Sequence, residues 1–478
     1  LRRPRPRSRT QKKRLRLDKT TAPILTQNMK SLSQYIDLYA ECRRQLDLVP
    51  KPIAALRPKA LDALRVFSEQ TMRRAPYTEA AIDRLLEPDY GLNIQRMGFA
   101  VDLSATFRCE VPNISTLLGV TLNDTFRPTE SLMRNIPEGL TVCSLTKAAA
   151  GMPSVVERYL NTLAADSTPQ AALNTLLFQD GVFVYAAKGV SVERPVQLVN
   201  IFNAPVPLMA PRRLLVVAEQ GASLRLLLCD HSQRNDIDYL SNEVIEVFVH
   251  RDASVEIYTI EENGASTRHI TSFHCRQEEG ARLTLNTNTL STATSTATYT
   301  IDLAGAGADT RLGGLVIADA GQTVVQNVEL THSVPDCTST QNFKFALSGK
   351  SKGAFGGKIV VKEGAVRTNA AQTNRNLIAS DDARMTTAPQ LEIYCDDVKC
   401  SHGATTGQLD PLALFYMRSR GIPEAEARLM LTQAFMADVV DSISYDLIRD
   451  RLRQLVERRL SGEKASCAAC AAENTCHC

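Results

Sequence analysis

Three side chains that can bind a metal ion or act as nucleophiles lie close together near the carboxyl end of the chain. Cys395, Cys400 and His402 fall within eight residues, in a segment (391–407) with the sequence L-E-I-Y-C-D-D-V-K-C-S-H-G-A-T-T-G. Cys400 and His402 are two positions apart, so in an extended strand both side chains project from the same face, with Cα atoms about 7 Å apart. A thiolate and an imidazole on one face can share a metal ion, or can act as a nucleophile and its base.

The spacing of Cys395 is different. It lies five positions before Cys400, an odd offset, so in a continuous strand it faces the opposite side and we exclude it from the site. A plainer alternative for the whole segment is a strand end with a buried thiol and a surface histidine, since free cysteine is among the most buried residue types.

A second group of thiols lies in the last twelve residues. The potential ligands are Cys467, Cys470, Cys476, His477 and Cys478. They could close a tetrahedral zinc or iron–sulfur site, and we name the four cysteines as candidate metal ligands. The alternative is a flexible tail with reactive thiols, because the Ala-rich spacing lacks the loop residues of a folded zinc module. The other eight cysteines are scattered without disulfide-like spacing, which predicts reduced thiols in the cytoplasm.

The 478 residues are enough for two or three domains, and the apolar content of 44% is that of an ordinary globular protein. No segment approaches about 18 consecutive apolar residues, so we expect no transmembrane helix and no membrane partner. The net charge of +3 is uneven, because residues 1–28 carry ten Lys or Arg and one acidic residue.

That basic segment has three interpretations. It can bind nucleic acid, serve as a targeting peptide, or be upstream sequence read through from a wrong start. We favour the last, because periodic structure begins at Met29, where the charge run ends. We therefore treat 1–28 as a basic disordered arm that is not native, and expect no nucleic-acid partner.

The middle of the chain repeats a small pair of residues before each of several strands. The pairs are Gly221-Ala222, Asp252-Ala253, Gly280-Ala281 and Gly307-Ala308, in steps of 31, 28 and 27 residues. Strands at such a period, without helices between them, indicate a stacked solenoid. We predict a right-handed parallel β-helix over 171–407, with a meandering sandwich as the alternative. Its exposed end, near 391–407, invites pairing with a partner.

The β-helix is flanked by other predicted regions. Residues 29–170 form a helical and mixed N-terminal domain, with helices expected at 29–48, 60–72 and 77–86. Residues 408–462 form a helical C-terminal domain, in which Asp410 is an N-cap before Pro411. The Cys-rich tail occupies 463–478.

Other residues that resemble functional motifs receive structural interpretations. The sequence Ser348-Gly-Lys-Ser351 resembles the end of a phosphate loop, but Lys344 stands where that motif needs glycine, so we expect no intrinsic ATP site and no intrinsic cofactor. Gln372, Asn374 and Asn376 alternate along one strand and predict a polar ladder inside the solenoid. The scattered histidines are interpreted as structural or surface residues: His231, His250, His269, His274 and His332.

Two segments resemble a known family. D-D-V-K-C-S-H-G-A-T-T-G, and L-F-Y-M-R-S-R-G-I-P at 414–423, are similar to the C-terminal signature of the SufB/SufD family of iron–sulfur cluster assembly scaffolds. SufB typically has H-E-A-T where this chain has S-H-G-A-T, so the sequence favours SufD. The resemblance covers about 178–460 well and 29–150 more loosely.

The resemblance implies a β-helix with helical ends and a non-enzymatic scaffold. It implies a SufB-like paralogue at the β-helix end and a SufC-like ABC ATPase on the C-terminal helices. It also implies that Cys400 and His402 face SufB, where iron or a transient iron–sulfur cluster is handled. The competing hypothesis is a β-helix enzyme acting on carbohydrate. Against it stand the absence of Trp for sugar stacking and of an evident carboxylate pair.

Overall fold

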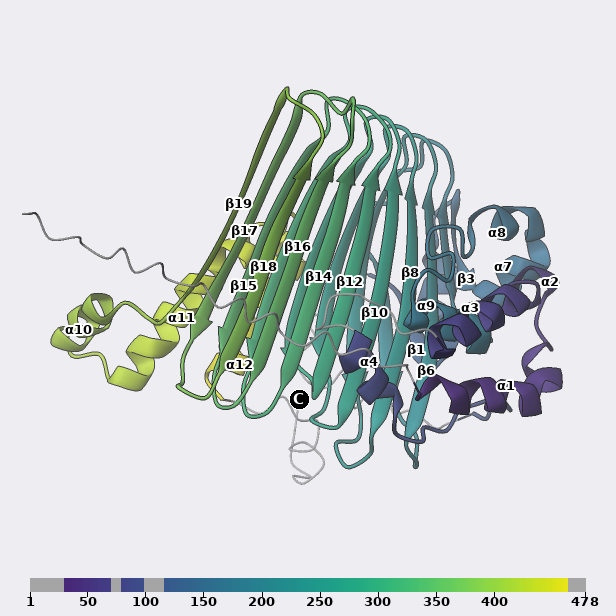
Figure 1. The fold of residues 1–478 in the computed structure, drawn as a ribbon, viewed down its shortest axis with the longest axis horizontal. Helices are drawn as coiled ribbons and strands as arrows, with labels where there is room; N and C mark the ends of the chain where they lie inside the picture. Colours follow the sequence, from purple (N-terminus) through teal and green to yellow (C-terminus); the bar gives the residue numbers. More distant parts are fainter. Residues whose placement is uncertain (1–29, 70–78, 99–115, 463–478) are drawn as a thin grey trace, which may run out of the picture.

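The computed structural model describes residues 30–69, 79–98 and 116–462, and its centre is a β-solenoid of eight turns between 182 and 407 (Figure 1). Each turn gives one strand to each of two parallel sheets, so the even-numbered strands β4–β18 pair with one another and the odd-numbered strands β5–β19 form the second sheet. The predicted parallel β-helix is therefore confirmed, and the sandwich alternative is wrong.

The strand bounds are β4 (Val182–Ala186), β5 (Val196–Phe202), β6 (Leu208–Ala218), β7 (Ser223–Ser232), β8 (Tyr239–Val249), β9 (Ser254–Glu262), β10 (Thr267–Gln277), β11 (Arg282–Ser291), β12 (Thr294–Leu303), β13 (Asp309–Ala318), β14 (Thr323–His332), β15 (Thr338–Leu347), β16 (Lys352–Val361), β17 (Thr368–Ile378), β18 (Arg384–Ile393) and β19 (Val398–Gly407).

The repeated pair of small residues forms a corner of the solenoid. Gly221, Asp252, Gly280 and Gly307 all have positive φ, between 57° and 72°, a conformation that favours glycine and tolerates aspartate. The alanine that follows each of them is buried in the main core cluster. Each stacked turn thus needs, at the same place, a residue with left-handed backbone conformation followed by a residue with a small side chain. This requirement explains the sequence repeat.

The N-terminal region closes one end of the solenoid. Strands β1 (Leu117–Leu122) and β2 (Thr125–Pro128) extend the odd sheet, and β3 (Leu140–Ser144) extends the even sheet. The helices of this region are α1 (Leu32–Leu46), α2 (Lys51–Ala54), α3 (Arg57–Glu69), α4 (Glu79–Leu86), α6 (Glu130–Asn135), α7 (Leu145–Gly151), α8 (Pro153–Tyr159) and α9 (Pro169–Leu177).

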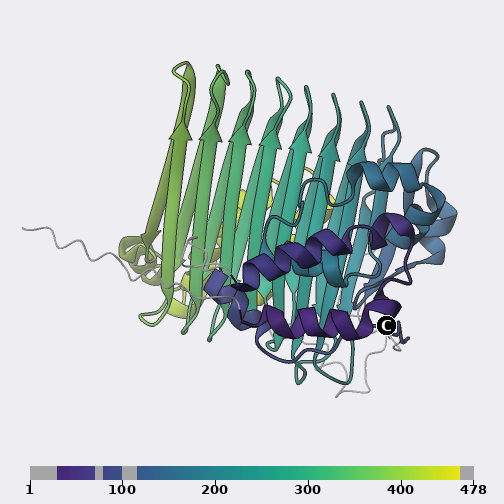
Figure 2. The ribbon, with the colours of Figure 1, turned by 45° about the vertical axis from the view of Figure 1, so that its right-hand side comes forward.

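These N-terminal helices also cover the outer face of the even sheet. Side chains of α1, α3 and α9 share one apolar cluster with Met209, Leu240 and Ile270 on β6, β8 and β10 (Figure 2). The predicted helices at 29–48, 60–72 and 77–86 correspond to α1, α3 and α4.

Three C-terminal helices follow the last strand: α10 (Pro411–Ser419), α11 (Glu424–Asp441) and α12 (Asp446–Leu460). The Asp410 side chain accepts a hydrogen bond from the Leu412 N–H (2.9 Å), as predicted for an N-cap. Helices α11 and α12 pack on the outer face of the odd sheet, where Val439 and Leu452 join a cluster with Leu315. In contrast, α10 lies beyond β19, and each of its residues is at least partly exposed (Figure 1). No helix in the described ranges is long and apolar enough to cross a membrane.

Candidate functional site

The C-terminal end of the solenoid is open. Within the described part of the chain, β18 pairs only with β16 and β19 only with β17, so each sheet ends in a free strand edge. Most residues of these two strands are exposed or half-buried, and Tyr394 between them is 63% exposed. A free edge offers backbone N–H and C=O groups to another chain, so this end of the molecule can accept a partner.

Cys400 and His402 lie on β19 at this open end. Cys400 pairs in register with Ala370 and His402 with Gln372, so both side chains belong to the face that β17 turns toward the solenoid interior. Cys400 is half-buried and packs beside the cluster formed by Ile359 and Val361, whereas His402 is exposed. The sequence thus correctly predicted a shared face, and the structure adds that this face lies at the open end.

The chemistry of Cys400 follows from its position. Burial raises the pKa of the Cys400 thiol above its usual value, although the Ala370 backbone opposes part of this shift. The group is therefore a thiol at neutral pH, and a metal ion that binds it must displace the proton. Both nucleophilic attack and metal binding by Cys400 therefore require loss of this proton.

Cys395 lies closer to this site than the strand argument predicted. The chain leaves β18 at Ile393 and enters β19 at Val398, so Cys395 is in the corner and not on one continuous strand. It packs against the same apolar cluster as Cys400. The argument that excluded Cys395 from the site is therefore wrong, because an odd spacing places two side chains on opposite faces only along an unbroken strand.

The polar ladder predicted at Gln372, Asn374 and Asn376 lies inside the turn next to Cys400 and His402. All three side chains are buried. Gln372 donates to Gln341 on β15 (2.9 Å), and Asn376 donates to Asn374 (2.7 Å) and to the Thr405 backbone on β19 (3.1 Å). The ladder is confirmed, and it ties the last strand to the solenoid interior.

The cysteines of the tail, at 467, 470, 476 and 478, and the basic arm 1–28 lie outside the described residues. Their predicted roles stay predictions.

The near-match to a phosphate loop occupies a strand-to-strand turn. Residues 348–351 connect β15 to β16, whereas a phosphate loop opens a helix whose N-terminal N–H groups bind the phosphates. We predict that the isolated chain does not bind ATP. Calorimetry with the pure chain should show no heat of binding, with an ATPase subunit as the positive control. Micromolar binding would contradict this.

Comparison with known proteins gives consistent matches over most of the chain. Residues 201–435 match the model of the SUF system FeS cluster assembly, SufBD core domain, and residues 29–198 match the SufBD protein N-terminal region. The chain is 28% identical over 370 residues to a Synechocystis protein named as an iron–sulfur cluster assembly SufBD family protein, a match that covers 75% of this chain and 81% of that one.

Two relatives carry the name iron–sulfur cluster assembly protein SufD. The protein of Bacillus subtilis is 26% identical over 328 residues, which cover 68% of this chain and 74% of the relative. The protein of Escherichia coli is 36% identical over 160 residues, which cover only 34% of this chain and 38% of the relative.

Proposed function

Because this chain belongs to the SufBD family of iron–sulfur cluster assembly proteins, we propose that it is a SufD-type scaffold subunit without catalytic activity of its own. It would act with a SufB-like paralogue at the open solenoid end and a SufC-like ATPase on the C-terminal helices. The observation that carries this proposal is the pair Cys400 and His402 on the last strand, whose outer edge is free.

Cys400 and His402 are too few ligands to hold an iron–sulfur cluster alone, so the remaining ligands must come from another chain. Protein-bound iron–sulfur clusters are generally held by four ligands, and Cys400 and His402 supply two. In our proposal a partner solenoid docks on the free edges of β18 and β19 and supplies the others. The nascent cluster or iron is then cargo held at the junction.

Helix α10 supports the proposed ATPase contact. Leu412, Phe415 and Tyr416 are 77%, 70% and 58% exposed, an apolar group on a helix that stands away from the solenoid. Exposed apolar groups of this kind mark protein interaction sites. A SufC-like subunit that covers them would be held next to the open end, where its ATP-driven movement could act on the junction.

We predict that Phe415→Asp weakens binding of the SufC-like ATPase by about tenfold or more, because a buried aromatic contact is replaced by a charge. The melting temperature should stay unchanged, since Phe415 is exposed in the free chain. Met133→Asp is the matched control, because Met133 is also exposed, at 59%, but its helix α6 packs on β1, near the end of the odd sheet opposite to β19 and α10. Equal affinity of both variants, measured by calorimetry, would exclude α10 from the interface.

Co-expression tests the function as a whole. The chain should co-purify with its SufB-like and SufC-like partners, and the complex should hold iron and sulfide under anaerobic analysis. A chain that purifies alone and degrades a polysaccharide would support the carbohydrate-active alternative.

A further inference from the structure

The interior of the solenoid contains a charged cluster far from the open end. Five side chains from five successive strands, β6 to β10, face one another where the odd strands end and the even strands begin. They are Arg212, Asp230, Glu243, Glu261 and His269, each at most 6% exposed. Charged groups are rarely buried unless they are paired or bind an ion, so the arrangement needs a physical explanation.

Three of these residues have the geometry of a metal site. Asp230, Glu243 and His269 each offer a ligand atom, and the three atoms lie within 4.8 Å of one another. Among the described residues, this is the one group of three or more His, Cys, Asp or Glu side chains that are so close. Small side-chain rotations would bring each of the three atoms to about 2.1 Å from one shared ion, the usual distance of a metal ligand.

The histidine is oriented as in known metal sites. His269 Nε2 lies 3.4 Å from Glu243 Oε2, and Nδ1 on the other side of the ring lies 3.6 Å from Glu261 Oε1. Glu261 is itself held by Ser295 (2.8 Å) and Thr289 (3.2 Å). A carboxylate on Nδ1 fixes the tautomer that presents Nε2 to a metal ion.

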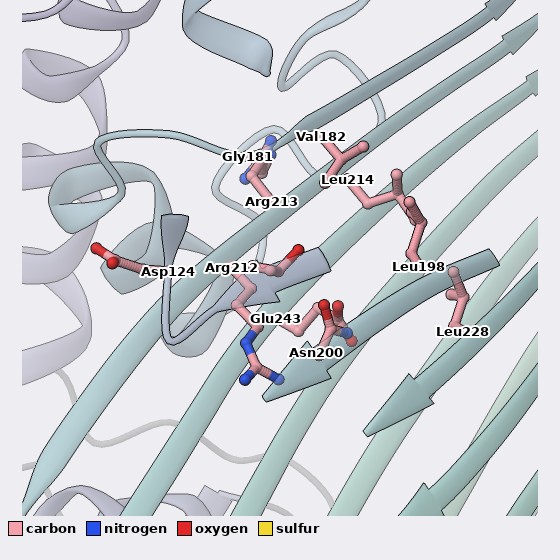
Figure 3. Close-up of a pocket in the computed structure, with 11 residues that line it drawn as sticks. Asp124, Gly181, Val182, Leu198, Asn200, Arg212, Arg213, Leu214, Leu228 and Glu243 are labelled. Carbon is pink, nitrogen blue, oxygen red and sulfur yellow. The ribbon is translucent and has the colours of Figure 1, made fainter. Parts of the chain in front are cut away.

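Asp230 is also oriented by fixed donors. Arg212 Nη1 (2.8 Å) and Asn200 Nδ2 (3.1 Å) both donate to Oδ1 of Asp230, which leaves Oδ2 as the oxygen that we assign to the ion. Figure 3 shows Asn200, Arg212 and Glu243 around the pocket on the N-terminal side of this cluster.

The volume of the adjoining cavity and the net charge of the cluster both suit a bound cation. A cavity of about 40 Å³ adjoins the cluster and is lined by Asp230, Glu243, Glu261 and His269. That volume is enough for an ion with a water molecule. Three carboxylates face one guanidinium and one imidazole here, so the cluster is net negative without an ion, and a bound cation offsets that charge.

We propose that Asp230, Glu243 and His269 bind one divalent first-row transition-metal ion inside the solenoid, with Glu261 as the positioning residue. We call this group the lumenal site. Carboxylate and imidazole donors without a thiol favour Fe²⁺ or Mn²⁺ over softer metals. The site is distinct from Cys400 and His402, because Asp230 on β7 and Cys400 on β19 are six strand positions apart in the odd sheet, about 29 Å at 4.8 Å per strand. The inference does not depend on the proposed function.

The test uses Mn²⁺, which carboxylates and imidazole bind better than thiols do. The full chain is produced in cells supplied with Mn²⁺, and metal per chain is measured by elemental analysis and by electron paramagnetic resonance. Wild type should retain one tightly bound Mn²⁺ per chain. Glu243→Gln and His269→Gln should each lower the affinity at least about a hundredfold, and Glu261→Gln about ten- to a hundredfold.

His332→Gln is the matched control. His332 is an equally buried histidine on β14 that bonds to Ser339 (2.9 Å), and its replacement should leave Mn²⁺ retention unchanged. Circular dichroism establishes that each variant is folded, and added Mn²⁺ should raise the melting temperature of wild type but not of Glu243→Gln. Wild type without bound Mn²⁺, or equal retention by folded Glu243→Gln, would overturn the proposal and leave a purely structural ion-pair network.

Discussion

Replacing Cys400 by serine or His402 by alanine is expected to reduce the iron–sulfur cluster yield of the assembled complex by about tenfold or more. Cys400→Ser removes a soft thiolate ligand with little change of volume, and His402→Ala removes the imidazole. The melting temperature should change by no more than about 2 °C, because β19 is the end strand with one free edge and both residues are at least partly exposed. Binding of the SufC-like subunit should be unchanged.

Ser401→Ala is the matched control for these two variants. Ser401 lies between them on β19, is exposed, and pairs with Ala371, so its side chain belongs to the opposite face of the strand. It should retain full cluster yield. A normal yield in both Cys400→Ser and His402→Ala would remove these residues from the site. A normal yield with a lower melting temperature in Cys400→Ser would instead assign Cys400 to core packing.

The second large effect concerns stability. Glu246→Ala is expected to lower the free energy of unfolding by about 3–5 kcal/mol, because it leaves a buried guanidinium unpaired. Glu246 on β8 and Arg213 on β6 form a 2.7 Å ion pair in which both side chains are 0% exposed. Glu246 also accepts hydrogen bonds from the backbone N–H groups of Asn161, Leu163 and Ala164, so it fixes the N-terminal region to the even sheet.

Arg234→Ala provides the control for that measurement. Arg234 and Asp236 also form a 2.7 Å ion pair, but their side chains are 43% and 67% exposed. Solvent screens such a pair, so its loss should leave the free energy of unfolding nearly unchanged. Urea unfolding followed by circular dichroism compares the two. A loss below about 1 kcal/mol for Glu246→Ala would show that solvent or neighbouring groups compensate the buried charge.

Much of the architecture was predictable from local patterns in the sequence. The corner residues Gly221, Asp252, Gly280 and Gly307 recur because every stacked turn needs the same backbone conformation at the same place. The shared face of Cys400 and His402 followed from the two-residue period of a strand. Asp410 was predicted as an N-cap because capping depends on nearest neighbours in the chain.

The corner at Cys395 and the lumenal site were decided by tertiary structure. The odd-offset argument for Cys395 assumes one continuous strand, but the chain leaves β18 at Ile393 and enters β19 only at Val398, so that argument does not place Cys395. Asp230, Glu243 and His269 are 13 and 26 residues apart, and His269 was interpreted as an isolated structural or surface histidine. The pairing of β8 with β10 brings Glu243 and His269 close, and Asp230 joins them from β7 in the facing sheet. Register depends on contacts between turns, which a pattern within one strand does not encode.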